Sequence, residues 1–124
     1  MTGKYIIKKT ETGAKFDLKA GNGEVILSSQ VYASATSCMA GIASIRSNVT
    51  SGAISIEDQT VEGFAQEKHP KIEIYLDKAG EYRFRMKARN GEIIGASEGY
   101  KTKAGCKNGV DSVIKNAPDA TVEE

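Results

Sequence analysis

The chain has no tryptophan, only two cysteines and two prolines, and a single histidine among its 124 residues. The histidine, His69, stands beside a proline, and neither a Cys-x-x-Cys nor a His-x-x-x-His spacing supplies the ligands of a zinc site. Two cysteines are also too few for a disulfide framework. We therefore predict a protein that holds no metal and no cofactor and is not built on disulfides.

An excess of charge of one sign and a long hydrophobic run are missing as well. Seventeen basic and 16 acidic residues leave a formal net charge of +1, which gives no general attraction to nucleic acid or to a membrane surface. No apolar stretch approaches the roughly 20 residues of a membrane span. Residues 1–9 contain only a three-residue apolar run, unlike a signal or transit peptide. We expect a cytoplasmic protein with no membrane partner.

What the sequence does contain is an internal repeat with an offset of 68 residues, which carries Asn22-Gly23-Glu24 onto Asn90-Gly91-Glu92. A match that keeps aromatic, glycine and apolar helix positions in register indicates a duplicated structural unit. The shared positions over residues 16–48 are Phe16/Phe84, Lys19/Lys87, Ala20/Ala88, Asn22/Asn90, Gly23/Gly91, Glu24/Glu92, Ile26/Ile94, Ser29/Ser97, Tyr32/Tyr100, Cys38/Cys106, Gly41/Gly109, Ser44/Ser112 and Asn48/Asn116.

The length of each repeat bears on the number of domains. A repeat of about 55 residues is near the lower limit for a stable core, whereas the whole chain fits one compact domain. We therefore predict a single domain over residues 1–124 in which the two repeats share one core. Repeat one covers residues 1–59, a polar linker covers 60–70, and repeat two covers 71–124.

Repeat two begins with two predicted strands. Hydrophobic and polar residues alternate over residues 72–77 and again over 82–89, as in half-buried strands. Residues 77–80 between them have the composition of a turn. A hairpin closed there sets Ile74 opposite Phe84, so the apolar faces of the two strands agree.

The Asn-Gly pair in each repeat predicts a second hairpin. Its register stays open at this point, because a two-residue turn and a three-residue turn with a bulge place Ile93 and Ile94 on opposite faces.

An amphipathic helix is expected next in each repeat, with Ser34 and Thr102 as N-caps. Pro118 ends the second helix, and a short strand follows each helix, over residues 54–58 and 120–124. The apolar positions of the helices recur at i, i+4, i+7 and i+11, and they are Cys38, Ile42, Ile45 and Val49 in repeat one and Cys106, Val110, Val113 and Ala117 in repeat two.

These motifs resemble those of the YegP-like family of small proteins. The likeness covers nearly the whole chain except the linker, and it rests on Lys-Ala-x-Asn-Gly-Glu, Ser-x-x-Tyr and the Gly-x-x-Ser-x-x-x-Asn helix segments in both repeats. The resemblance implies an α+β fold of tandem strand-strand-strand-helix-strand units, with the final strands exchanged between the repeats. We expect one shared antiparallel sheet with both helices on one side, in a monomer that acts as an internal pseudo-dimer. The resemblance implies no activity, cofactor or catalytic residue.

Several residues that could suggest chemistry have a structural explanation. Residues 21–23 resemble a phosphate-binding loop, but they lead into a strand and not into a helix. Cys38 and Cys106 fall on the apolar stripes of the helices, where thiols act as small hydrophobes; whether either is reactive depends on a basic neighbour or a helix N-terminus. Gly41 and Gly109 lie inside helices at a cost of about 1 kcal/mol, which indicates close approach of another element.

The candidate functional residues form a basic row along the predicted strand 82–89. Alternation should place the row on one strand face, with Tyr75 opposite Arg83 and Glu73 opposite Arg85. It could be a solvated face that keeps the sheet soluble or a surface for phosphates or an acidic partner. The members of this basic row are Arg83, Arg85, Lys87 and Arg89.

The favoured function is a small, non-catalytic binding or interaction module that binds a nucleic acid or an acidic protein weakly through this face. The alternative is a structural or accessory protein with no ligand. An enzyme is the least favoured class, because the sequence suggests no nucleophile paired with a base.

Overall fold

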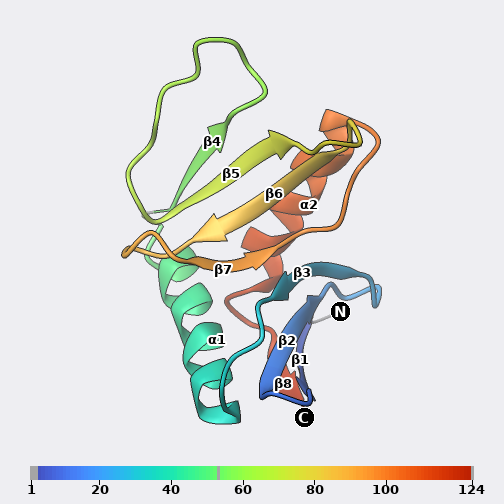
Figure 1. Cartoon of the computed structure of the whole chain (residues 1–124), viewed down its shortest axis with the longest axis vertical. Helices are drawn as coiled ribbons and strands as arrows, with labels where there is room; N and C mark the ends of the chain where they lie inside the picture. Colours follow the sequence, from blue (N-terminus) through green and yellow to red (C-terminus); the bar gives the residue numbers. More distant parts are fainter. Residues whose placement is uncertain (1–2, 53, 124) are drawn as a thin grey trace.

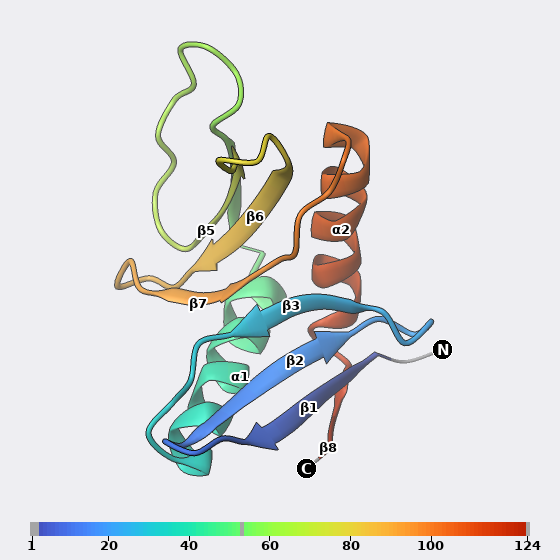
Figure 2. The same ribbon diagram turned by 45° about the vertical axis from the view of Figure 1, so that its right-hand side comes forward.

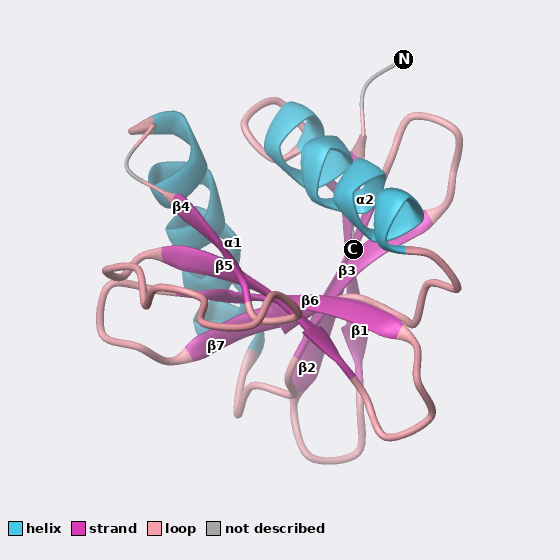
Figure 3. Cartoon of the chain, turned by 90° about the horizontal axis from the view of Figure 1, so that it is seen from above, coloured by secondary structure: helices cyan, strands magenta, loops and turns pink. Residues whose placement is uncertain are grey.

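The computed structural model describes residues 3–52 and 54–123. Eight strands form one twisted sheet in the order β4-β5-β6-β7-β3-β2-β1-β8, and both helices lie on the same side of it (Figures 1 and 3). Repeat one contributes β1 (Lys4–Lys9), β2 (Ala14–Lys19), β3 (Val25–Ser29), α1 (Ala35–Thr50) and β4 (Ser55–Asp58). Repeat two contributes β5 (Lys71–Leu76), β6 (Tyr82–Lys87), β7 (Ile93–Ala96), α2 (Lys103–Asn116) and β8 (Thr121–Glu123).

The final strands are exchanged between the repeats, as the family resemblance implied. The strand β4 pairs with β5 of repeat two, and β8 pairs with β1 of repeat one. Both pairings are parallel, so the sheet is mixed and the expectation of a wholly antiparallel sheet is wrong at its two edges. Glu124, expected as the end of the last strand, lies outside the described residues.

The parallel pairing explains why a linker separates the repeats. Adjacent parallel strands cannot be joined by a tight turn, because the chain must return to the starting edge of the first strand. The segment 59–70 makes this return from β4 to β5, and it forms the long loop beyond these strands in Figures 1 and 2. A linker is therefore needed between β4 and β5, although neither repeat contains an equivalent of it.

The first hairpin of repeat two has the expected register. Ile74 lies opposite Phe84, and the Asp77 N–H donates to the carbonyl of Glu81 at 2.9 Å. The alternation in the sequence therefore predicted the buried side of this hairpin, where Ile72, Ile74, Phe84 and Met86 are buried.

The Asn-Gly hairpins adopt the three-residue connection with a bulge. The Ala88 N–H donates to the carbonyl of Glu92 at 2.9 Å, and Gly91 has a φ of 84° that favours glycine. The pairing shifts between Met86 and Lys87. As a result Ile94 is buried while Ile93 is exposed, which resolves the register that the sequence left open.

The helices begin at the expected caps. The Ser34 hydroxyl accepts the Ser37 N–H at 3.1 Å, and the Thr102 hydroxyl accepts the Gly105 N–H at 3.0 Å. Each such cap satisfies one of the N–H groups that have no partner in the first turn. The predicted apolar stripe of each helix is buried against the sheet.

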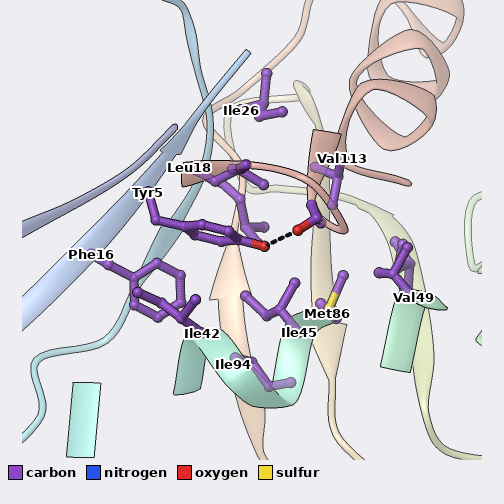
Figure 4. Close-up of a cluster of buried hydrophobic side chains, with 14 of the residues drawn as sticks. Tyr5, Phe16, Leu18, Ile26, Ile42, Ile45, Val49, Met86, Ile94 and Val113 are labelled. Atoms are coloured by element: carbon purple, nitrogen blue, oxygen red, sulfur yellow. Dashed lines mark hydrogen bonds between the residues drawn. The ribbon is translucent and has the colours of Figure 1, made fainter. Parts of the chain in front are cut away.

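The core draws side chains from both repeats (Figure 4). Tyr5 and Phe16 of repeat one pack edge to face with their ring centroids 5.9 Å apart. The Tyr5 hydroxyl donates to the carbonyl of Ala117, just after α2, at 2.7 Å. Met86 and Val113 of repeat two are fully buried in the same cluster. Neither repeat could therefore be removed without exposing apolar surface of the other.

The helix glycines make room for a tyrosine ring. Tyr100 stacks on Phe84 with their ring centroids 6.3 Å apart, and its hydroxyl end lies over Gly109. A Cβ at Gly109 would come within 2.9 Å of Tyr100 Cζ and 3.0 Å of Phe84 Cε2. Gly41 has the same relation to Tyr32 and Phe16. The close approach inferred from the sequence is therefore an approach of the tyrosine side chain to the helix backbone.

We expect Gly109→Leu to destabilise the protein by about 1–3 kcal/mol through overpacking, although leucine has the better helix propensity. Urea unfolding at neutral pH measures the change. Asn108→Leu is the control at an exposed position of the same helix, where the free energy of unfolding should barely change. A stabilised Gly109→Leu variant would contradict the contact with Tyr100.

Candidate functional site

The sheet face away from the helices, here called the open face, collects the charged side chains. Strand alternation directs the apolar residues toward the helices, so the residues between them point the other way. Paired positions trace one row across all eight strands. From edge to edge this row is Glu123, Ile6, Asp17, Ser28, Ala96, Arg85, Glu73 and Glu57.

Three members of the basic row lie on the open face in β6. Tyr75 is opposite Arg83, and Glu73 is opposite Arg85, as expected. The Arg85 guanidinium lies 4.4 Å from the centroid of the Tyr75 ring, a cation–π contact that occupies the aromatic face. One face of the Tyr75 ring is therefore already occupied by Arg85.

The fourth member, Arg89, does not belong to this face. The strand β6 ends at Lys87, where the bulge and the hairpin turn interrupt the alternation on which the expectation depended. Arg89 instead lines a cavity with Ser44 and Asn48 of α1, on the helix side of the sheet. The expected placement of all four cations on one strand face is wrong for Arg89.

The cations of the basic row that do lie on the open face are held in ion pairs. Arg83 Nε is 2.6 Å from Asp77 Oδ2. Arg85 Nε and Lys87 Nζ are 2.6 and 3.2 Å from the same Glu73 oxygen, Oε1. A ligand at this row would have to compete with carboxylates that are already in place.

Behind the row, Lys71 joins two buried carboxylates. Its ammonium nitrogen is 2.8 Å from Glu57 Oε1 and 3.1 Å from Glu73 Oε2, and its side chain is 6% exposed. These hydrogen bonds, above all the one to Glu57, outweigh burial and raise the pKa of Lys71. Together with Arg85 and Lys87, which pair with Glu73, Lys71 balances the charges of both buried carboxylates.

Burial by itself would raise the pKa of Glu57, but the hydrogen bonds to its carboxylate outweigh it and lower this pKa to about 2. Gln59 donates to one carboxylate oxygen at 2.6 Å, and the backbone N–H of Glu67 donates to the other at 2.7 Å. The linker thus folds against this end of the open face. The sequence could not indicate this cluster, because Glu57 reaches Lys71 only through the strand exchange.

The repeat-one half of the open face is less neutralised. Lysines occupy four positions, and the carboxylates among them are Asp17 and Glu123. Asp17 lies 2.9 Å from Lys8 and 3.5 Å from Lys15, and Lys4 lies 3.1 Å from Glu123. Among the described residues, the linker forms its hydrogen bonds to β4, to β5 and within itself and not to this half. We call this set the lysine face: Lys4, Lys8, Lys15 and Lys19.

The lysine face was not among the candidate binding surfaces predicted from the sequence. Its signal was present as the alternation of Lys4 and Lys8 in β1, two positions that the comparison of the repeats did not include. Asp17 occupies the position that Arg85 has in repeat two. The two halves of one duplicated face therefore differ in the arrangement of their charges.

The thiols offer no reactive site. Cys38 and Cys106 are fully buried, and burial raises the pKa of both, with the Asp58 charge adding to it at Cys106, whose pKa is about 11. Both are therefore protonated at neutral pH. Among the described residues, no group of three His, Cys, Asp or Glu side chains is placed to hold a metal ion. In the same part of the chain, no helix is long and apolar enough to cross a membrane.

The fold and the site together define a tandem-repeat α+β protein with a charged open face. The family model described as "Domain of unknown function (DUF1508)" matches residues 12–55 and 77–124, once in each repeat. The chain belongs to this family, and the resemblance to YegP-like proteins is confirmed.

Among its relatives, the UPF0339 protein YegP of Yersinia pestis is 37% identical over 123 residues, covering 98% of this chain and 95% of that protein. A UPF0339 protein of Treponema denticola is 59% identical over 54 residues, which cover 44% of this chain and 93% of that protein. That relative is therefore about as long as one repeat. The solution NMR structure of the UPF0339 protein SO3888 from Shewanella oneidensis matches with a TM-score of 0.79 at 33% identity, covering 99% of this chain and 91% of that one.

Proposed function

We propose that the protein is a non-catalytic interaction module whose open face binds an acidic partner weakly, without sequence preference. The observation that supports this proposal is the lysine face, where four ammonium groups surround only two carboxylates. Lys4 and Lys8 each keep about half of their side-chain surface exposed. Their charges remain accessible to a polyanion that approaches the sheet.

The basic row has a smaller part in this proposal. Arg83, Arg85 and Lys87 would reach a polyanion at the centre of the same face, but only by sharing or leaving Asp77 and Glu73. Arg89 lies outside the face, and one face of the Tyr75 ring is occupied by Arg85. We therefore assign the main contact to the lysine face and a secondary contact to the row.

The strength of such binding follows from counterion release. Four phosphate contacts to a single strand give a slope of about −3 in log affinity against log salt, so a fourfold rise in salt lowers the affinity about 60-fold. Arg85 occupies one face of the Tyr75 ring, which limits base stacking, a source of modest base preference, on this surface. An acidic protein segment would be bound by the same ammonium groups.

The test is a fluorescence anisotropy titration of a labelled single-stranded oligonucleotide of mixed sequence at about 50 and 200 mM salt. The variant changes all four residues of the lysine face to glutamine, which keeps a hydrogen-bond donor for the buried Asp17. We expect the wild-type protein to bind at low salt with the slope given above and the variant to show no binding. An acidic peptide run in parallel identifies which kind of polyanion is preferred.

The matched control removes four exposed lysines from elsewhere on the chain, so the change in net charge is identical. If this control loses binding as the variant does, the contact is unspecific and not a property of the lysine face. If the wild-type protein binds no polyanion even at low salt, the open face is only solvated and the alternative of a structural protein without a ligand gains support. The four control positions are Lys68, Lys78, Lys101 and Lys107.

A further inference from the structure

On the open face, two lysines lie directly opposite each other on neighbouring strands in each repeat. Lys71 of β5 is opposite Lys87 of β6, and Lys4 of β1 is opposite Lys19 of β2. Side chains paired in this way have their Cβ atoms about 4.5–5.5 Å apart, and like charges at such positions destabilise a sheet. Each pair therefore favours a negative group placed between its two ammonium groups.

In repeat two, Glu73 provides this negative group. Its Oε2 atom lies 3.1 Å from Lys71 Nζ, and its Oε1 atom lies 3.2 Å from Lys87 Nζ. One carboxylate thus bridges the two opposed lysines with one oxygen for each. Its side chain is 3% exposed, so the bridge is part of the folded protein and closed to an outside partner.

Repeat one has the two lysines without the bridging carboxylate. Ile6 lies opposite Asp17 in β2, and Glu73 lies opposite Arg85 in β6. Asp17 and Arg85 are equivalent under the offset of 68 residues. Ile6 therefore stands at the position of Glu73, where its side chain brings no charge.

The carboxylates near Lys4 and Lys19 do not replace the missing bridge. Glu123 lies 3.1 Å from Lys4, but it does not pair with Lys19. Asp17, two residues from Lys19 in the same strand, pairs with two other lysines of the lysine face. Among the described residues, the ammonium group of Lys19 has no ion-pair or hydrogen-bond partner.

A cavity of about 330 Å³ lies at this place on the open face. Lys4, Ile6 and Lys19 line it, together with Glu123 and the turn that follows β2. Gly21 of this turn, where repeat two has an arginine, adds no side chain that could fill the cavity. The linker, whose Glu67 N–H bonds to the equivalent cluster in repeat two, leaves this place uncovered. The position of the bridging carboxylate is therefore accessible from outside.

We propose that this place, here called the bridging site and defined by Lys4, Ile6 and Lys19, binds a side-chain carboxylate of an acidic protein segment. One carboxylate oxygen pairs with each ammonium group, as the oxygens of Glu73 do in repeat two. The inference rests on the proposed function of the lysine face and names the partner of that face, because the group that fills the equivalent place is itself a glutamate.

The bridging site should hold a carboxylate less tightly than repeat two holds its own. Glu73 also receives Arg85 at 2.6 Å, whereas repeat one has Asp17 at the position of Arg85. The charge of Asp17 is offset by its two lysine partners, so it does not close the bridging site to an anion. Binding by two exposed lysines agrees with the weak contact proposed for this face.

The decisive variant is Ile6→Glu, which introduces into repeat one the carboxylate that repeat two contains. This carboxylate should occupy the bridging site from within and exclude that of a partner. The probe is N-acetyl-triglutamate amide, added to the full isotope-labelled chain and followed by amide NMR shifts. With wild type we expect saturable shifts that are largest at Lys4, Ile6, Lys19 and Gly21. Ile6→Glu should bind at least about tenfold more weakly, since two ion pairs are lost and each contributes up to about fivefold.

Two controls separate the carboxylate from other effects of the substitution. Ile6→Gln is nearly equal in size to Ile6→Glu but uncharged, and it should bind triglutamate as wild type does. Thr12→Glu adds the same charge at an exposed residue in the turn between β1 and β2. Thr12 lies beyond Lys9, and the stretch from Lys4 to Lys9 alone spans about 17 Å of strand. This distance exceeds the Debye length of about 10 Å at about 0.1 M salt, so at this salt concentration Thr12→Glu should weaken binding by no more than about twofold.

Failure of the bridging site and failure of the proposed function give different results. If Ile6→Glu weakens triglutamate binding no more than Thr12→Glu or Ile6→Gln does, the bridging site is overturned, while the lysine face remains a surface for polyanions. If triglutamate gives no saturable shift but the labelled oligonucleotide is bound, the assignment to a carboxylate is overturned and the proposed function stands. If neither probe is bound at low salt, both are overturned.

Discussion

Residues 71–124 expressed alone should give a dimer or an unfolded chain and not a folded monomer. In the described part of the intact protein, β8 has its only strand partner in β1 of repeat one, and β5 depends on β4 for its outer edge. The excised repeat would also lose Tyr5, whose hydroxyl bonds to the carbonyl of Ala117. Two copies could restore both edges by exchanging β8, because each copy would supply the strand that the other lacks.

Light scattering after size-exclusion chromatography and amide NMR dispersion decide between these states. Mixing residues 1–59 with residues 71–124 is the control, since the two pieces together contain every strand and should form a one-to-one complex of native-like spectrum. A well-dispersed, cooperatively unfolding monomer of residues 71–124 would contradict the shared sheet. The existence of a Treponema denticola relative of about one repeat in length makes exchange between identical chains the expected outcome.

Features of the fold that depend on local periodicity could be predicted from the sequence. Alternation in β5 and β6 predicted that Ile74 faces Phe84, and the helix stripe predicted that Cys106 is buried, because these features depend on local periodicity. The helix glycines indicated a close contact, but only the structure identifies its partner as a tyrosine ring. The strand exchange came from the family resemblance and not from the residues.

What could not be predicted depends on contacts between distant segments. The parallel direction of β4 against β5 depends on the path of the chain from the end of α1 into β4. No local sequence pattern indicates this path. The displacement of Arg89 follows from a bulge that shifts the register by one residue. The cavities between the helix of one repeat and the Asn-Gly hairpin of the other could not be predicted, because they depend on how the two repeats pack together.

The open face illustrates how the duplicated unit diverged. In both halves an exchanged strand brings a glutamate to a lysine of the other repeat, Glu57 to Lys71 and Glu123 to Lys4. The first pair is buried beside the linker, whereas both members of the second are about half exposed. The same arrangement is therefore part of a buried cluster of paired charges in one half and of an accessible charged surface in the other.

Because of this contrast, we expect the two lysines to contribute very differently to the stability of the fold. Lys71→Met should destabilise the protein by about 3–5 kcal/mol at neutral pH, because it leaves the buried carboxylates Glu57 and Glu73 without the cation between them. Lys4→Met removes the equivalent lysine from an exposed pair and should cost no more than about 1 kcal/mol. Urea unfolding of the two variants beside wild type measures both values.

The pH dependence gives a further check on the same cluster. In the folded protein the pKa of Glu57 is lowered from 4.5 to about 2. Its ionised form therefore stabilises the fold above pH 4.5, and this contribution is lost as the pH falls from 4.5 toward 2. In Lys71→Met the main cation that keeps Glu57 ionised despite its burial is gone. Glu57 of the folded variant therefore binds a proton more readily, and protonation in acid removes the buried charge. The difference in unfolding free energy between wild type and Lys71→Met should thus shrink as the pH is lowered. Equal costs for Lys71→Met and Lys4→Met, or a difference that stays constant from pH 7 to pH 3, would mean that the cluster is not closed to solvent.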